Sequence, residues 1–336
     1  MLVEDSASDI VSCENQAAMY KAQSGVDISF VTSGTFDEAI SKYDNSFDGA
    51  IIDLKLGDDI GGGNRVIERI KDLNARIPVC VTTGTPANVD DVDGSFIQSY
   101  VKGDFEYNEI FSIFTNYYKS GITKIFSAKG TVEKLLRSIY YESIFLQKEV
   151  WFSYGEKDPD ASERGLLRHT INNMLHRLDE NSDTYFKEEF YIVPPSKNEL
   201  KTGSIISHDS KKFVILTPAC DLVPRANLNG QPKTSHIVLV VIEPQNEYLK
   251  DDTSEKDKNK LKSNNKVLNL HYMPSAYDFE GGFINFRNIE TKDTITFYDT
   301  LKSKCLIQIS PFFLKDIISR FSTFYARQGQ PDINIM

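Results

Sequence analysis

Polar side chains that could carry phosphoryl-transfer chemistry stand at the ends of short apolar runs. Asp53 follows the apolar run at 50–52 and precedes a turn that ends in three glycines at 61–63. A carboxylate attacks phosphorus only when the repulsion between the two anions is relieved by a cation. A lone carboxylate at the end of a strand is often no more than a polar residue that closes it, so Asp53 needs partners elsewhere in the chain.

The chain offers such partners at the ends of other apolar runs. An acidic pair, Glu4 and Asp5, lies near the start, Thr83 ends a run that begins at 77, and Lys102 ends a run that begins at 96. Mg²⁺ prefers oxygen ligands and keeps part of its water shell. The predicted Mg²⁺ ligands are Glu4, Asp5, Asp53 and the backbone carbonyl of Lys55. Lys102 would pair with the carboxylate and then with the new phosphoryl oxygen, to which Thr83 would donate a hydrogen bond.

The elements that would hold these residues alternate between strands and helices. Helices are expected to begin near Ser6, Thr35 and Asn64, between strands at 2–5, 26–31, 50–53, 77–83 and 96–102. Such alternation predicts a parallel, doubly wound α/β sheet with right-handed crossovers. Functional groups of these sheets gather at the carboxyl ends of the strands, which is where the acidic pair, Asp53, Thr83 and Lys102 lie.

Residues 1 to about 118 resemble a response-regulator receiver domain. The motifs that carry the resemblance are V-E-D-S at 3–6, I-I-D-L-K-L-G-D-D-I-G-G-G at 51–63, V-T-T-G-T-P at 81–86 and Y-V-K-G-D at 100–104. The resemblance implies a flavodoxin-like, five-stranded fold, Mg²⁺ as cofactor, and a histidine kinase or phosphotransfer protein as partner. It also implies roles for five residues: an acid pair (Glu4, Asp5), a phosphoryl acceptor (Asp53), a switch hydroxyl (Thr83) and a lysine (Lys102).

The sequence departs from the receiver pattern at three points. Gly103 stands where the family usually has a proline after the lysine, so the cis peptide of that loop is expected to be absent. Ser99 occupies the position of the family's switch aromatic, with Tyr100 one residue later. Only three residues precede the acid pair, so we expect that the natural start lies upstream or that the first strand was trimmed. The alternative to a phosphorylated domain is a pseudo-receiver used only for docking.

The rest of the chain is predicted to form a helical connector at 119–185 and a strand-rich α+β output domain at 186–336. Residues 105–150 carry apolar residues at helical spacing, interrupted near Gly121, and a second amphipathic helix is predicted at 162–178. His169 and His176 share a face of that helix, and ordinary surface or core histidines are favoured over a metal site.

The output domain is predicted from strongly apolar, β-branched runs. Strands are expected at 190–193, 203–206, 212–222, 237–242, 267–271, 282–286 and 294–298, followed by a helix at 311–327. Residues 250–266 are almost free of apolar side chains, which predicts a mobile excursion or a polar surface helix.

Two stretches of the output domain could form a site. Cys220 and Asp221 end an apolar strand, which suggests a nucleophile; a buried cysteine beside a turn-capping aspartate is the alternative. Arg320 and Arg327 share a helix face and could bind an anion, although pairing with acidic neighbours such as Asp316 is the more frequent outcome.

Composition and charge restrict the remaining possibilities. No apolar run reaches the roughly 18 residues that span a bilayer, and no signal peptide is visible. The four cysteines are widely spaced, which favours reduced thiols in a cytoplasmic protein and makes a structural zinc site improbable. Residues 1–105 hold 18 acidic and 8 basic residues, and the remainder holds 30 of each. Nucleic-acid binding is therefore possible but not supported by charge.

The predicted function is that of a two-component response regulator, phosphorylated on Asp53 with Mg²⁺ and controlling an output domain of unknown activity. The first alternative is a phosphorylation-gated enzyme, such as a nuclease or other hydrolase, and the second is a non-catalytic module that binds nucleic acid or protein. The only enzymatic chemistry predicted is the receiver's own phosphorylation and dephosphorylation. A homodimer could form through the apolar helices of 105–150.

Overall fold

A computed structural model describes residues 1–44, 46–73, 76–84, 97–127, 129–179, 184–196, 199–264 and 267–327. The predicted motif residues Thr85 and Pro86, the first residue of the predicted strand at 96–102 and the stretch from 328 lie outside these ranges. The chain divides into two compact units, Met1–Asn181 and Ser182–Met336, and each is described by itself.

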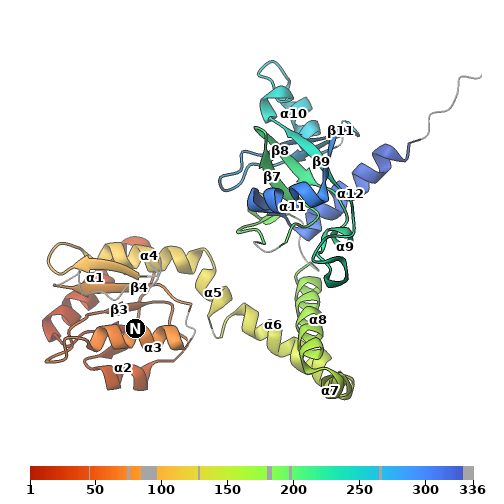
Figure 1. Ribbon diagram of the computed structural model, residues 1–336. Coiled ribbons are helices and arrows are strands. Elements are labelled where there is room, and N and C mark those ends of the chain that lie inside the picture. The colour runs from red at the N-terminus through yellow and green to blue at the C-terminus, as the bar shows by residue number, and fades with distance from the viewer. Residues whose placement is uncertain are drawn as a thin grey trace, which may run out of the picture. The chain divides into compact units, whose positions relative to one another are not determined.

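The N-terminal unit contains a five-stranded sheet in the order β2-β1-β3-β4-β5 (Figure 1). Every pairing between neighbouring strands is parallel. The strands are β1 (Leu2–Val3), β2 (Thr32–Ser33), β3 (Ala50–Ile52), β4 (Val79–Thr83) and β5 (Ile97–Val101). The predicted parallel α/β sheet is therefore confirmed. The predicted strand at 26–31 is wrong, because β2 pairs only with the two residues of β1 and begins after Val31.

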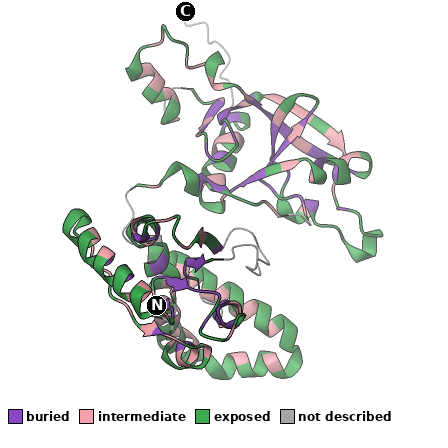
Figure 2. Ribbon diagram, turned by 90° about the vertical axis from the view of Figure 1, so that its left-hand side faces the viewer, coloured by how far each residue is buried: buried purple, intermediate pink, exposed green. Residues whose placement is uncertain are grey.

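Helices cover both faces of this sheet. They are α1 (Ala7–Ser24), α2 (Phe36–Lys42), α3 (Gly62–Asp72) and α4 (Tyr107–Lys119). Ser6 caps α1 by accepting a hydrogen bond from the backbone N–H of Asp9 at 3.4 Å, and Gly25, with φ of 72°, ends the helix. One apolar core joins the sheet to α2 and α3, and a second joins it to α1 and α4. Figure 2 shows that buried residues concentrate on the strands.

A helical hairpin ends the N-terminal unit. A short helix, α5 (Ile122–Phe126), precedes a longer helical run made of α6 (Thr131–Ile139), a π-helical turn (Tyr140–Ile144), a 3₁₀ turn (Phe145–Gln147) and α7 (Lys148–Lys157). This run packs against α8 (Pro159–Asp179). Arg177 bonds to Ser138 while His169 bonds to Ser143, so the two arms are antiparallel. We call residues 131–179 the hairpin.

The C-terminal unit is built on a seven-stranded sheet in the order β10-β11-β9-β8-β7-β12-β6, and every pairing in it is antiparallel. The strands are β6 (Tyr191–Ile192), β7 (Ser204–His208), β8 (Lys211–Ile215), β9 (His236–Glu243), β10 (Leu270–Met273), β11 (Gly282–Asp293) and β12 (Cys305–Ile309). This is the predicted strand-rich arrangement.

Helices lie against both faces of the C-terminal sheet. One core contains residues of α12 (Pro311–Tyr325), and the other contains residues of α9 (Ala219–Leu222) and α11 (Thr294–Ser303). The predicted strand at 294–298 is wrong: Asp293 accepts a hydrogen bond from the N–H of Thr296 at 2.9 Å and starts α11 there. The polar stretch at 250–266 contains a short helix, α10 (Glu255–Lys262), with no buried side chain.

Candidate functional site

The carboxyl ends of four neighbouring strands bring polar side chains to one edge of the N-terminal sheet. Glu4 follows β1, Asp53 follows β3, Thr83 ends β4 and Lys102 follows β5. The backbone hydrogen bonds between neighbouring strands continue to these positions. The Asp53 N–H donates to the Val3 carbonyl and the Lys102 N–H donates to the Thr83 carbonyl, each at 2.9 Å. The alignment of the strands thus sets the spacing between the side chains.

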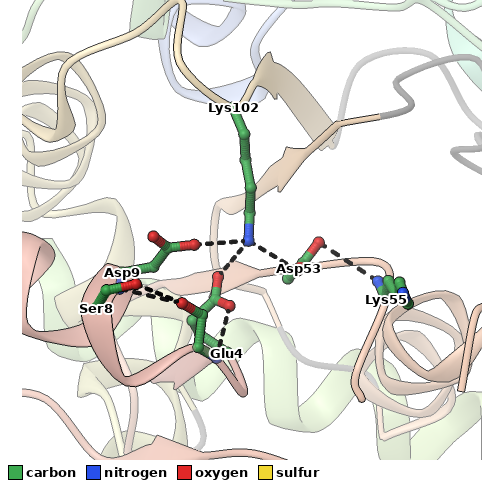
Figure 3. Close-up of polar contacts among 7 residues, drawn as sticks. Glu4, Ser8, Asp9, Asp53, Lys55 and Lys102 are labelled. Atoms are coloured by element: carbon green, nitrogen blue, oxygen red, sulfur yellow. Dashed lines mark hydrogen bonds and ion pairs between the residues drawn. The ribbon is translucent and has the colours of Figure 1, made fainter. Parts of the chain in front are cut away.

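Lys102 is the centre of the site (Figure 3). Its ammonium nitrogen lies 2.8 Å from Glu4 Oε2, 2.8 Å from Asp53 Oδ2 and 3.0 Å from Asp9 Oδ2. Burial acts to lower the pKa of Lys102, but the hydrogen bonds to Asp53, Glu4 and Asp9 outweigh it, so the pKa is raised. A permanently charged lysine shared by three carboxylates can neutralise an anion that arrives at Asp53.

Asp9 is a member of this cluster that the sequence reasoning missed. It lies in the first turn of α1, which follows the acid pair directly after the cap at Ser6. The only signal for it was its spacing, one helical turn beyond Asp5, which points an acidic residue back toward the end of the first strand.

Three carboxylates form a possible cation site beside the lysine. Oxygens of Glu4, Asp5 and Asp53 lie within 4.8 Å of one another; Glu4 and Asp53 are buried and Asp5 is exposed. Burial raises the pKa of Glu4, against the lowering effect of its hydrogen bond with Lys102. Hard oxygen donors close enough to share one ion, with one side open to water, fit a divalent cation such as Mg²⁺.

The loop at 54–61, which we call the acceptor loop after the role predicted for Asp53, packs closely against α3. The Gly63 N–H donates to the Leu54 carbonyl at 3.0 Å. A Cβ atom on Gly63 would lie 2.1 Å from the Asp53 carbonyl oxygen and 2.6 Å from Leu54 Cα. Only glycine fits there, and this packing holds the backbone of Asp53 in place. Lys55 contacts Asp53 through its own N–H, which lies 3.4 Å from Oδ1.

Comparisons with known proteins found similar chains among solved structures. No protein-family model and no curated protein matches the chain. Among solved structures, the receiver domain of the Francisella response regulator 1452 is 17% identical, covering 35% of this chain and 94% of that one, with a TM-score of 0.24. A CheY-like receiver domain from Methanospirillum hungatei is 18% identical (36% and 95% covered, TM-score 0.25). The Mn²⁺-bound response regulator Rcp1 is 26% identical (35% and 89%, TM-score 0.25).

The strand order decides the fold. An all-parallel sheet in the order 2-1-3-4-5, wound with helices on both faces, is the flavodoxin-like arrangement of receivers. The first 119 residues have the receiver-domain fold. The resemblance seen in the sequence is therefore confirmed for the fold. No helix in the described part of the chain is long and apolar enough to cross a membrane.

The N-terminal domain differs from the pattern of receiver domains in the loop after Lys102. Gly103 has φ of 92° and closes a turn in which the Asp104 N–H donates to the Val101 carbonyl at 3.0 Å. Proline cannot adopt that φ. The backbone conformation of this turn therefore excludes the proline that receiver domains usually have after the lysine. Tyr100 is half-buried and its ring packs on Phe105 with centroids 5.4 Å apart, whereas Ser99 is exposed.

The candidate cysteine of the C-terminal unit is surrounded by local contacts. The prediction that Cys220 and Asp221 end a strand is wrong, because β8 ends at Ile215 and both residues lie in α9. Cys220 is exposed, so it is not the buried cysteine of the alternative interpretation. Its Sγ lies 3.8 Å from Asp221 Oδ1, and Lys233 lies 3.8 Å from the same carboxylate oxygen. Two histidines of the same unit that could act as a base for the thiol, His208 and His236, do not contact it: His208 pairs with Asp209 and Lys304, and His236 with Ser235.

The two candidate arginines do not form a joint anion site. Arg320 donates to three backbone carbonyls, those of Asn264, Val267 and Leu270, at 2.8 to 3.0 Å, and not to Asp316. Arg327 donates to the Phe324 carbonyl at 3.0 Å and lies over the Phe324 ring. The contacts of these arginines do not include Cys220 or Asp221. Arg320 therefore holds the segment before β10 onto α12.

Among the described residues, the two histidines of α8 belong to no group of side chains that could hold a metal ion. His169 bonds to Ser143 and Asn173 and packs on Trp151. Within the described ranges, the only group of three or more His, Cys, Asp or Glu side chains close enough to share a metal is the one around Asp53.

Proposed function

We propose that this chain is a two-component response regulator that accepts a phosphoryl group on Asp53, with Mg²⁺ as cofactor. The observation that carries the proposal is the convergence of Asp53, the two acids Glu4 and Asp5, and the ammonium group of Lys102 at one edge of a receiver sheet. A pseudo-receiver with no chemistry would not need to keep all of these groups together.

The chain's own residues would perform the transfer by positioning and charge neutralisation. The Asp53 carboxylate forms a bond to phosphorus while the P–N bond of a phosphohistidine donor breaks, and the electron pair leaves with the imidazole. Mg²⁺, held by Glu4, Asp5, Asp53 and the backbone carbonyl of Lys55, would supply positive charge to the phosphoryl oxygens. Lys102 would exchange one of its carboxylates for a phosphoryl oxygen, and the buried Thr83 would donate a hydrogen bond to another.

The donor in this proposal is a histidine kinase or a phosphotransfer protein, and the C-terminal unit is the output. The output could be a nuclease or other hydrolase, or a module that binds nucleic acid or protein. No contact among its described residues favours one of these alternatives over another. The balanced charge of residues 106–336 predicts that any nucleic-acid binding is weak and sensitive to salt.

Mass spectrometry of the intact protein tests the proposal. Incubation with Mg²⁺ and a small acyl phosphate should add one hydroxylamine-labile phosphoryl group, and addition of EDTA should prevent it. Asp53→Asn should abolish labelling. Asp58→Asn is the matched control, because Asp58 lies exposed in the same loop and outside the carboxylate cluster; it should label like the parent. Equal labelling of Asp53→Asn and the parent would contradict the assignment, and so would a parent that is never labelled.

A further inference from the structure

Asp9 differs from the other two carboxylates that bind the Lys102 ammonium group. Glu4 and Asp53 are buried and belong to the group of carboxylates close enough to share a cation, whereas the Asp9 side chain is 38% exposed and lies outside that group. In the view of Figure 3, Asp9 and Asp53 reach the ammonium group from opposite sides. The partners of the lysine thus divide into two that would hold a cation and one that lies apart.

Lys102 and a cation would compete for the two buried carboxylates. The ammonium group has three N–H donors, and its nitrogen lies 2.8, 2.8 and 3.0 Å from oxygens of Glu4, Asp53 and Asp9. A divalent cation on Glu4 and Asp53 weakens their hold on the ammonium group, because two positive charges then share the same acceptors and repel each other.

The proposed transfer changes the partnership with Asp53 as well. When Asp53 forms its bond to phosphorus, its carboxylate charge passes to the phosphoryl group, and the ammonium group has to bind a phosphoryl oxygen in place of Asp53 Oδ2. Asp9 takes no part in that bond and lies outside the cation group. Of the three carboxylates, Asp9 alone therefore remains the same acceptor for Lys102 before and after the transfer.

The exposure of the three carboxylates favours a role for Asp9 in holding the lysine over one in drawing it away. The Asp9 side chain is 38% exposed, against 1% for Glu4 and 9% for Asp53. Because water screens an exposed ion pair more than a buried one, Asp9 is the weakest of the three partners. It cannot remove the ammonium group from a buried carboxylate or a phosphoryl group, but it can hold the lysine once the other carboxylates are engaged.

The start of α1 fixes Asp9 in this position. Its N–H donates to Ser6 Oγ at 3.4 Å, and the N–H of Ser6 donates to Glu4 Oε1 at 3.1 Å. A carboxylate in the first turn of a helix also interacts favourably with the positive end of the helix dipole. The cap of α1 therefore joins Asp9 to the acid that follows β1.

We propose that Asp9 is a positioning residue, which holds the Lys102 ammonium group beside Asp53 when Mg²⁺ has engaged the two buried carboxylates. The proposal rests on the proposed function, because it assigns a task to Asp9 in the cation-bound state of that site. Without Asp9, the Lys102 side chain, which is already 29% exposed, would turn toward solvent once Mg²⁺ binds.

The rate at which Lys102 of the full chain reacts with an amine-modifying ester, measured by peptide mass spectrometry, tests the proposal. At saturating Mg²⁺, Lys102 of Asp9→Asn should react about fivefold faster than Lys102 of the parent, relative to the exposed Lys119 in the same sample. In EDTA the two proteins should react alike, because the two buried carboxylates then hold the ammonium group. Asp58→Asn is the matched control: Asp58 is exposed and outside the carboxylate cluster, so this variant should match the parent in both conditions.

A second variant and the comparison of the two conditions keep the test specific. Asp9→Ala leaves no acceptor at all and should give at least the same increase at saturating Mg²⁺, whereas an amide oxygen in Asp9→Asn still accepts a hydrogen bond. A disturbed fold would raise the reactivity of Lys102 in EDTA as well as in Mg²⁺. Parent reactivity in both variants at saturating Mg²⁺ would overturn the proposal, and so would an equal increase with and without Mg²⁺.

Two measurements on the parent separate these outcomes from a failure of the proposed function. They are calorimetric titration with Mg²⁺ and labelling of Asp53 with a small acyl phosphate. If the parent binds Mg²⁺ and is labelled while both Asp9 variants react like the parent, the proposed function stands and only the role of Asp9 is refuted. A parent that binds no Mg²⁺ would overturn both.

Discussion

The close packing of Gly63 against the acceptor loop leads to a specific prediction for Gly63→Ala. The new methyl group would lie 2.1 Å from the Asp53 carbonyl oxygen, where ordinary contacts between heavy atoms are about 3.5–4.0 Å. Both neighbours, Asp53 and Leu54, contribute backbone atoms to the clash, so no side-chain rotation relieves it. Either the end of β3 or the start of α3 must move by more than about 1 Å.

The cost of this substitution follows from the size of the overlap. Overpacking a buried position costs about 1–3 kcal/mol, and a clash with backbone atoms of two consecutive residues, Asp53 and Leu54, belongs at the upper end, about 3 kcal/mol. For a unit of about 180 residues, this lowers the melting temperature by about 6–12 °C. The same movement displaces the Asp53 carboxylate from Glu4 and Asp5, so the Mg²⁺ concentration needed for half-maximal stabilisation should rise.

Thermal and urea unfolding of the full chain, with and without Mg²⁺, would measure both effects. Gly84→Ala is the matched control, because Gly84 is exposed at the same edge of the sheet and a Cβ atom there would meet no atom of a described residue within 4 Å. It should stay within about 0.5 kcal/mol of the parent. If Gly63→Ala were as stable as Gly84→Ala and bound Mg²⁺ normally, the argument that this glycine fixes the acceptor loop would be refuted.

Three further predictions concern buried or shared charges. Burial, together with the positive charge of Arg320, lowers the pKa of His271 to about 3; the nearest carboxylate, on Asp316, is exposed and 3.6 Å away. The folded C-terminal unit keeps His271 neutral, whereas in the unfolded chain this histidine takes up a proton as the pH falls through about 6.5. The C-terminal unit should therefore lose about 2 kcal/mol of stability between pH 6.5 and pH 5. His271→Leu should remove that slope in urea unfolding, and an unchanged slope would assign it to other groups. Arg320→Met should destabilise the C-terminal unit by about 3 kcal/mol, because three backbone carbonyls lose a charged donor. Arg327 is exposed, so the control variant Arg327→Met should change the stability of the unit by less than about 0.5 kcal/mol. Equal losses of stability in the two variants would contradict the role given to Arg320. Lys102→Ala leaves the buried carboxylates of Glu4 and Asp53 without their cation, so it should lower stability in EDTA by about 2–3 kcal/mol. Added Mg²⁺ should restore part of this loss. An unchanged stability in EDTA would mean that the ion pairs of Lys102 contribute nothing to folding.

Much of the receiver domain could be predicted from the sequence because its signals are local or topological. The cap at Ser6 and the stop at Gly25 depend on residues within one helical turn. Alternating strands and helices imply a parallel sheet, and a parallel sheet brings the carboxyl ends of its strands to one edge. That rule alone was sufficient to place Asp53, Thr83 and Lys102 on the same edge.

Two of the predictions that failed depended on neighbours far away in the chain, and a third failed because of the residue directly before it. Residues 26–31 have a strand-like pattern, but a strand exists only where a partner pairs with it, and β1 pairs with 32–33. Residues 294–298 have strand-like β-branching, but the cap at Asp293 starts α11. Arg320 looked like half of an anion site because the carbonyls that it binds lie 50 to 56 residues earlier in the chain.

The sequence by itself determined the types and order of the groups around Asp53, since residue chemistry and strand alternation are written in local patterns. Only the tertiary structure decided that Lys102 is shared by three carboxylates, that Asp9 is one of them, and that Gly63 must be a glycine. The physical reason is that hydrogen bonds and close contacts depend on distances between segments: Lys102 meets Asp9 across 93 positions and Glu4 across 98. No periodicity in the chain encodes such a distance.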